Sequence, residues 1–184
     1  DPGMSRAHTG LGNALRALGD SPGAAAAYRA AIRLDPADAN SHNGLGNVLA
    51  DGGDPAGAAA AYREALRLNP TLSHAHNGMG NVLLAAGDGA GAEAAYREAI
   101  RLDPGNAFPH HNLGLVYDRL RADVGRAEAC YREAVRANPR YADAHANLGD
   151  ALRRQGRHPE AVPAYRAALA VQPTLRFARD GLDY

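Results

Sequence analysis

Residues 42–70 read HNGLGNVLADGGDPAGAAAAYREALRLNP, and the pattern returns 34 residues later, over 76–104, as HNGMGNVLLAAGDGAGAEAAYREAIRLDP. The two stretches are identical at 21 of 29 positions. Self-similarity at a fixed period indicates one supersecondary unit copied along the chain, each copy burying its apolar face against its neighbours. We therefore predict a repeat array whose functional surface is shared by several copies.

Prolines divide the 184-residue chain into units, at Pro36, Pro70, Pro104, Pro139 and Pro173, spaced 34, 34, 35 and 34 residues apart. We expect one domain over residues 1–184, with repeats at 5–38, 39–72, 73–106, 107–141 and 142–175. Residues 176–184 restart the pattern. They are expected to form a partial helix that caps the last repeat, although a truncated sixth repeat is equally compatible.

Each unit is predicted to hold two helices. Apolar residues with helical spacing, such as Leu45 and Leu49, indicate a first helix, A. In the first three units a Gly-Asp pair then interrupts the pattern, as at Gly53-Asp54, where glycine can end one helix and aspartate can cap the next. The second helix, B, ends before the proline, which disfavours helix at the preceding residue. The fourth unit has one extra residue and lacks the Gly-Asp pair, which predicts an irregular turn with Asp123 as the cap.

Composition restricts the class of partner and the compartment. The chain has no lysine, and its twenty arginines balance twenty acidic residues, so the formal net charge is zero. A nucleic-acid binder would be expected to show a net basic surface, so we expect no nucleic-acid partner. The single cysteine, Cys130, excludes an internal disulfide. No apolar run approaches the roughly 18 residues of a membrane span, and no signal peptide is apparent, so we expect a cytoplasmic protein without a membrane partner.

The third unit shows a signature most clearly, in His76, Met79-Gly80, Leu83, Ala92, Tyr96, Ala99 and Pro104. This spacing, held in all five units, resembles the tetratricopeptide repeat family. The resemblance implies an all-α, right-handed superhelical solenoid of five helix pairs plus a partial C-terminal helix, with the A helices along the concave wall. One departure is the first signature position, usually a bulky aromatic, which is histidine in every unit: His8, His42, His76, His110 and His145. We expect these histidines to pack between the A and B helices.

Asparagine recurs on the face that the resemblance assigns to this wall. Position nine of the repeat is Asn13, Asn47 and Asn81, and position five is Asn43 and Asn77. Asparagine is unfavourable inside helices, so its repetition calls for a compensation. Because an amide offers two donors and an acceptor, we predict a ladder that binds the backbone of an extended peptide. Two alternatives stay open: the asparagines bond to neighbouring repeats, or they descend from one duplicated ancestor.

Charged and aromatic-ring residues on the same face are candidates for selecting the side chains of a partner, namely Arg16, His74, His111, Arg119 and Arg153. Family members that capture chaperone tails use lysine at position five, where this chain has Thr9, Asn43, Asn77, His111 and Ala146, so we reject that mode. The recurrent histidines stand about one repeat apart, too far to share a metal ion. No phosphate loop, nucleophile elbow or paired carboxylates are present, and we expect no catalytic residue, cofactor or metal.

The B helices carry their own recurrent pattern. Glu64, Glu98 and Glu133 stand three residues before Arg67, Arg101 and Arg136, which predicts ion pairs on a solvated face. A tyrosine recurs on the opposite, core side, at Tyr28, Tyr62, Tyr96, Tyr131 and Tyr165. Neither pattern indicates a cofactor site.

The sequence as a whole predicts a non-catalytic scaffold that binds a peptide or protein segment in the concave groove. A second hypothesis is that the array is the targeting arm of a larger enzyme, because its Leu-Gly-Asn helices resemble the repeats of O-linked N-acetylglucosamine transferases. A third is self-assembly into a homo-oligomer through the terminal repeats.

Overall fold

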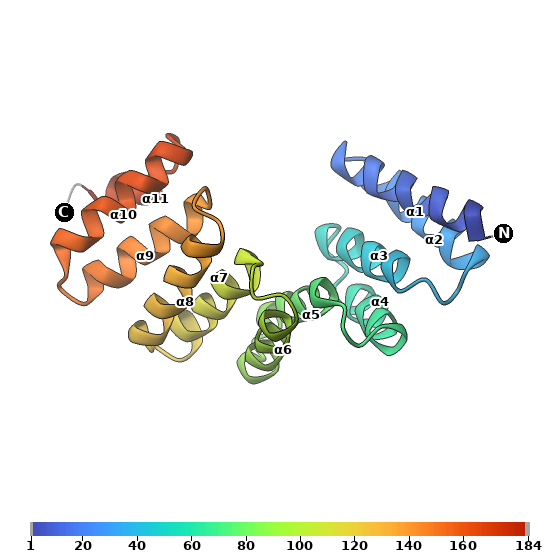
Figure 1. Ribbon diagram of the computed structural model, residues 1–184, viewed down its shortest axis with the longest axis horizontal. Helices are drawn as coiled ribbons and strands as arrows, with labels where there is room; N and C mark the ends of the chain where they lie inside the picture. Colours follow the sequence, from blue (N-terminus) through green and yellow to red (C-terminus); the bar gives the residue numbers. More distant parts are fainter. Residues whose placement is uncertain (1, 183–184) are drawn as a thin grey trace. The chain divides into compact units, whose positions relative to one another are not determined.

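The computed structural model describes residues 2–182 and confirms an all-α solenoid of five helix pairs with a short terminal helix (Figure 1). The A helices are α1 (Pro2–Ala17), α3 (Ala39–Asp51), α5 (Ser73–Ala85), α7 (Ala107–Leu115) and α9 (Ala142–Arg154). The B helices are α2 (Ser21–Leu34), α4 (Pro55–Leu68), α6 (Gly89–Leu102), α8 (Val124–Ala137) and α10 (His158–Val171). The terminal helix is α11 (Arg176–Asp180), and the last two residues of the predicted segment 176–184, Asp183 and Tyr184, lie outside the described residues.

The helices group into two compact units, one ending at Leu102 and the other beginning at Asp103. Unit 1 contains α1 to α6, and unit 2 contains α7 to α11. Within unit 1 each A helix packs on the B helix that follows it, and α3 also contacts both α1 and α5. We call the side formed by the A helices of a unit its A face and the side formed by its B helices its B face.

The core tyrosines of α2 and α4, Tyr28 and Tyr62, are each wedged between glycines of two A helices. Tyr62 on α4 is only 2% exposed. A Cβ placed on Gly46 of its own repeat would lie 2.7 Å from the ring, and one on Gly78 of the next repeat would lie 2.5 Å from it. The small residues therefore let one large ring fill the junction between successive repeats, and buried alanines such as Ala58 and Ala65 close the remaining space.

The break between A and B helices follows the prediction. Gly19, Gly53 and Gly87 have φ of 81°, 78° and 79°, in the left-handed region that glycine occupies without a steric penalty. The aspartate that follows each glycine caps the B helix: Asp54 Oδ1, for example, accepts a hydrogen bond from the Gly57 backbone N–H at 2.8 Å. Local sequence alone thus fixes where each of these helix pairs bends.

The extra residue of the fourth repeat is absorbed by a widened turn. A π-helix at Val116–Leu120 follows α7 directly, and Ala122 then adopts a φ of 50°. Asp123 caps α8 as predicted, because its Oδ1 accepts from the Arg126 N–H at 3.0 Å. A single π-turn is the usual way in which one inserted residue is accommodated inside a helix.

Candidate functional site

The asparagines at position nine each hold the core tyrosine of their own repeat. The Oη of Tyr28 donates to Asn13 Oδ1 at 2.6 Å, and the same bond is 2.8 Å long from Tyr62 to Asn47 and from Tyr96 to Asn81. Burial raises the pKa of Tyr62 to about 12, so its phenol keeps the proton that it donates. Each of these asparagines therefore has an internal partner in the tyrosine of its own repeat.

These amides still reach the A face. Asn13 and Asn81 are exposed, and Asn47 is half-buried. The tyrosine hydroxyl is bonded to the oxygen of each amide, which restrains the orientation of the group and leaves the NH2 group out of this bond. The structure thus places three oriented amides at intervals of one repeat along unit 1.

The asparagines at position five are half-buried in the same unit. In repeat 1 this position is Thr9, whose Oγ1 lies 3.0 Å from Asp38 Oδ2 and 2.7 Å from Ser41 Oγ. The equivalents of those two partners one repeat later are Leu72 and Ala75, which offer no polar group. Accordingly, the buried Oδ1 of Asn43 has no hydrogen-bond partner among the described residues.

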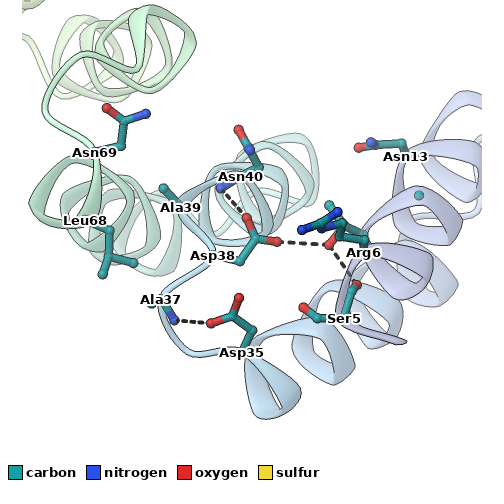
Figure 2. Close-up of a pocket in the computed structure, with 12 residues that line it drawn as sticks. Ser5, Arg6, Asn13, Asp35, Ala37, Asp38, Ala39, Asn40, Leu68 and Asn69 are labelled. Carbon is teal, nitrogen blue, oxygen red and sulfur yellow. Dashed lines mark hydrogen bonds between the residues drawn. The ribbon is translucent and has the colours of Figure 1, made fainter. Parts of the chain in front are cut away.

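A polar hollow of about 720 Å³ opens beside the first of these amides (Figure 2). Arg6 and Asn13 project toward it from α1, and Asn40 lies at the start of α3. Burial acts to raise the pKa of Asp38, but hydrogen bonds from Ser41, Thr9 and the backbone outweigh it and hold that pKa below its usual value. Arg6 forms no hydrogen bond or ion pair with any other residue of the described range. The hollow therefore presents one cation that is unpaired among the described residues, next to side-chain amides and the carboxylates of Asp35 and Asp38.

Two of the predicted selector residues also lie in unit 1. Arg16, in the last turn of α1, is 3.7 Å from Asp51 on α3, and the two side chains are 45% and 61% exposed. An ion pair this exposed adds little stability, so Arg16 can exchange Asp51 for another anion. His74 is exposed in the first turn of α5.

His111 is placed differently from the other selector residues, because it is only 7% exposed. The amide of Asn147 donates to its Nε2 at 2.9 Å, which leaves the ring proton on Nδ1, 3.1 Å from Tyr141 Oη. Burial lowers the pKa of His111 and so favours this neutral form. His111 is thus a largely buried residue that orients Tyr141 and Asn147.

The remaining two candidates lie in unit 2. Arg119 is exposed in the π-helix and lines a hollow of about 370 Å³ together with His111, Asp143 and Phe177. Arg153 on α9 donates to Asp150 at 2.6 Å and lines a smaller hollow of about 140 Å³. The ten predicted site residues are therefore divided between the units, with all five asparagines in unit 1.

The recurrent histidines have a role that sequence reasoning missed. The Nε2 of His42, His76, His110 and His145 lies 2.9 to 3.1 Å from the carbonyl oxygen of the proline six residues earlier. Each ring thereby ties an A helix to the turn that precedes it. The constant His–Pro spacing was visible in the sequence, but nothing local indicated that the two groups meet.

Residues 2–182 contain no group of three or more His, Cys, Asp or Glu side chains that could hold a metal ion. No helix in that range combines the length and apolar character needed to cross a bilayer.

Comparison with known proteins supports the architecture. A family described as "Tetratricopeptide repeat" matches residues 9–73 and 113–175, and one described as "TPR repeat" matches residues 80–120. No curated protein matches the sequence.

Solved structures with the same arrangement of helices show low sequence identity. The MamA protein superposes with a TM-score of 0.71 at 26% identity, covering 92% of each chain. PilF of Pseudomonas aeruginosa gives 0.84 at 23% identity, covering 91% of this chain and 76% of that one. YrrB, described as "a TPR protein with an unusual peptide-binding site", gives 0.70 at 20%, covering 96% and 91%. At such identities the likeness to PilF and YrrB shows a shared fold alone.

Proposed function

The chain belongs to the tetratricopeptide repeat family, and we propose that it is a non-catalytic scaffold that binds an extended segment of another protein along the A face of unit 1. The proposal follows the general use of repeat arrays, whose stacked units present long continuous surfaces to a partner. YrrB, which shares the fold, is described as having a peptide-binding site. The equal numbers of arginines and acidic residues favour a protein partner over nucleic acid.

The single observation that carries the proposal is the fixed orientation of the position-nine amides. Tyr28, Tyr62 and Tyr96 occupy the amide oxygens of Asn13, Asn47 and Asn81. Donor groups oriented in advance lose little conformational freedom when a ligand binds. An extended backbone offers a carbonyl acceptor at every residue, so a ladder of N–H donors fits it without reading its side chains.

Side-chain selection would come from the residues around the ladder. Arg6 in the hollow beside Asn13, and Arg16 at the end of α1, would favour a segment with an acidic residue near these positions. Asn43, Asn77 and His74 complete the proposed surface in unit 1. Unit 2 has its own candidate contacts with a partner, in which Arg119 and Arg153 would bind directly and His111 would act through Tyr141 and Asn147. A cytoplasmic location is part of this proposal.

Asn47→Asp separates ligand binding from internal support. Aspartate keeps an oxygen for the Tyr62 hydroxyl but removes the NH2 group that a ligand carbonyl would need. We expect the variant to stay folded and to bind a peptide selected from a display library at least about tenfold more weakly than the unchanged chain, as measured by fluorescence anisotropy.

The matched control is Asn138→Asp, which makes the same chemical change at the C-cap of α8, where the equivalent residues of other repeats, Asp35 and Asp103, are already aspartates. Its affinity should stay within about twofold of the unchanged chain. Equal binding by Asn47→Asp and Asn138→Asp would mean that the ladder is not the binding site. The targeting-arm and self-assembly hypotheses stay predictions from the sequence.

A further inference from the structure

The B face of unit 1 carries an apolar hollow of about 470 Å³ between α2 and α4, with α3 as its floor. Leu45 and Leu49 form the floor, Ile32 lies on one side, and Ala60 and Ala61 lie on the other. The hollow stays unfilled because three of the four α4 residues that line it, Gly57, Ala60 and Ala61, are small. Its volume falls in the range of about 300–1,000 Å³ that is typical of ligand sites. Apolar side chains of a partner would be removed from water there.

Two arginines at the edge of this hollow have no counterion among the described residues. Arg29 and Arg33 are exposed on α2, four residues apart and so about 6 Å apart along the helix axis. Neither forms a hydrogen bond or an ion pair with another residue of the described part of the chain. The equivalent arginines of repeat 3 are both paired: Arg97 with Glu93 at 2.8 Å, and Arg101 with Glu98 at 2.6 Å.

The difference between the two repeats lies in the sequence of α2. Ala25 and Ala30 stand where α6 has Glu93 and Glu98. Without these glutamates, two positive charges lie beside an apolar surface. The carboxylate on the other side of the hollow, Glu64, accepts two hydrogen bonds from Arg67, at 2.7 and 2.9 Å. The uncompensated charge of the rim is therefore positive.

We propose that this hollow on the B face docks an acidic amphipathic helix of a partner protein. Leucine-like side chains would fill the hollow, and two carboxylates one turn apart would pair with Arg29 and Arg33. A helix presents an apolar stripe with charges along its flank, which matches an apolar floor beside a row of cations at helical spacing. An extended segment points successive side chains to opposite faces and matches this surface less well. The site is separate from the A face and does not depend on the function proposed above.

The test uses the whole chain and a synthetic probe. The probe is a labelled helical peptide of about 18 residues, with leucines every third or fourth position and glutamates beside them, and its counterpart has lysine in place of each glutamate. Anisotropy titrations should show the acidic probe binding at least about tenfold more tightly than the basic one. The affinity for the acidic probe should fall as salt is added, because rim charges are screened.

Two variants locate the binding. Ala30→Glu rebuilds in α2 the ion pair that Glu98 forms with Arg101 in α6, and Arg29→Gln/Arg33→Gln removes the cations from an exposed surface without touching the core. Each variant should bind the acidic probe at least about tenfold more weakly than the unchanged chain. The matched control, Arg97→Ala/Arg101→Ala, removes the equivalent arginines of repeat 3 and should change the affinity by less than about twofold.

Several results would overturn the proposal. One is equal affinity for the acidic and basic probes, and another is unchanged binding in both α2 variants. If Asn47→Asp no longer binds the acidic probe while Arg29→Gln/Arg33→Gln binds it normally, the probe binds on the A face. Sedimentation could instead show a dimer that depends on concentration and is lost in Arg29→Gln/Arg33→Gln. In that case the occupant of the hollow is a second copy of the chain.

Discussion

At the scale of single residues, the asparagine and tyrosine of a repeat act as a pair. Asparagine costs helix propensity on α3, and the hydrogen bond from the buried Tyr62 to Asn47 offsets that cost. Repeat 4 lacks this hydrogen bond between tyrosine and asparagine. Leu115 stands at the asparagine position, and the buried hydroxyl of Tyr131 has no partner among the described residues. The internal use of the asparagines therefore follows from core chemistry, independently of any ligand.

This difference predicts opposite effects for one substitution at two equivalent sites. Tyr62→Phe removes a satisfied hydroxyl and should lower the free energy of unfolding by about 1 kcal/mol. Tyr131→Phe removes a buried hydroxyl that lacks a partner, so the free energy of unfolding should stay the same or rise by up to about 1 kcal/mol. Urea denaturation of both variants measures the contrast. An equal loss in the two would show that Tyr131 has a partner in solution, such as a bound water.

At the scale of the helices, local signals in the sequence were sufficient for most boundaries and insufficient for one. The Gly-Asp pairs located the breaks, because the left-handed glycine and the capping aspartate act within a few residues of each other. The same logic identified Asp123 as the cap of α8. It could not identify the π-helix, because the shape of the turn depends on keeping Val116 and Tyr117 buried, 0% and 4% exposed, against other helices.

The same turn predicts a stabilising substitution. Ala122 has a φ of 50°, a conformation that costs a residue with a Cβ about 1–2 kcal/mol and costs glycine almost nothing. Ala122→Gly should therefore raise the free energy of unfolding by up to about 1 kcal/mol, as measured by thermal and urea denaturation.

Gly53→Ala is the reverse change and serves as the control. Gly53 has a φ of 78°, and a Cβ there would meet no atom within 4 Å, so its cost is conformational alone. Gly53→Ala should therefore lower the free energy of unfolding by about 1 kcal/mol. A loss for Ala122→Gly as well would mean that the π-helix and its turn have another geometry.

At the scale of the whole chain, each unit is held together by contacts between one repeat and the next. Which residues make those contacts was only partly predictable. Helical spacing identified the tyrosines as core residues, but the ring of Tyr28 also reaches Gly44 of the following repeat. Likewise the charge pattern of α2 could be read from Ala25 and Ala30, whereas the hollow beside it depends on how α2 and α4 are spaced. Contacts between separate helices require coordinates, because spacing along one helix does not specify its neighbours.

The glycine at position six of the repeat tests this account of stacking. A Cβ at Gly44 would lie 2.4 Å from the ring of Tyr28, which is buried and cannot move aside easily, so Gly44→Ala should separate repeats 1 and 2 and cost about 1–3 kcal/mol. Gly10 occupies the same position in repeat 1 and would place its Cβ more than 4 Å from any atom outside its own helix, so Gly10→Ala should be neutral or gain up to about 1 kcal/mol from helix propensity. Hydrogen exchange should show reduced protection of α1 and α2 in Gly44→Ala, with unit 2 unchanged, because stability in a repeat array is a sum of nearest-neighbour terms. If Gly44→Ala and Gly10→Ala instead behave alike, the tyrosine ring does not join successive repeats, and the small residues of the signature need another explanation.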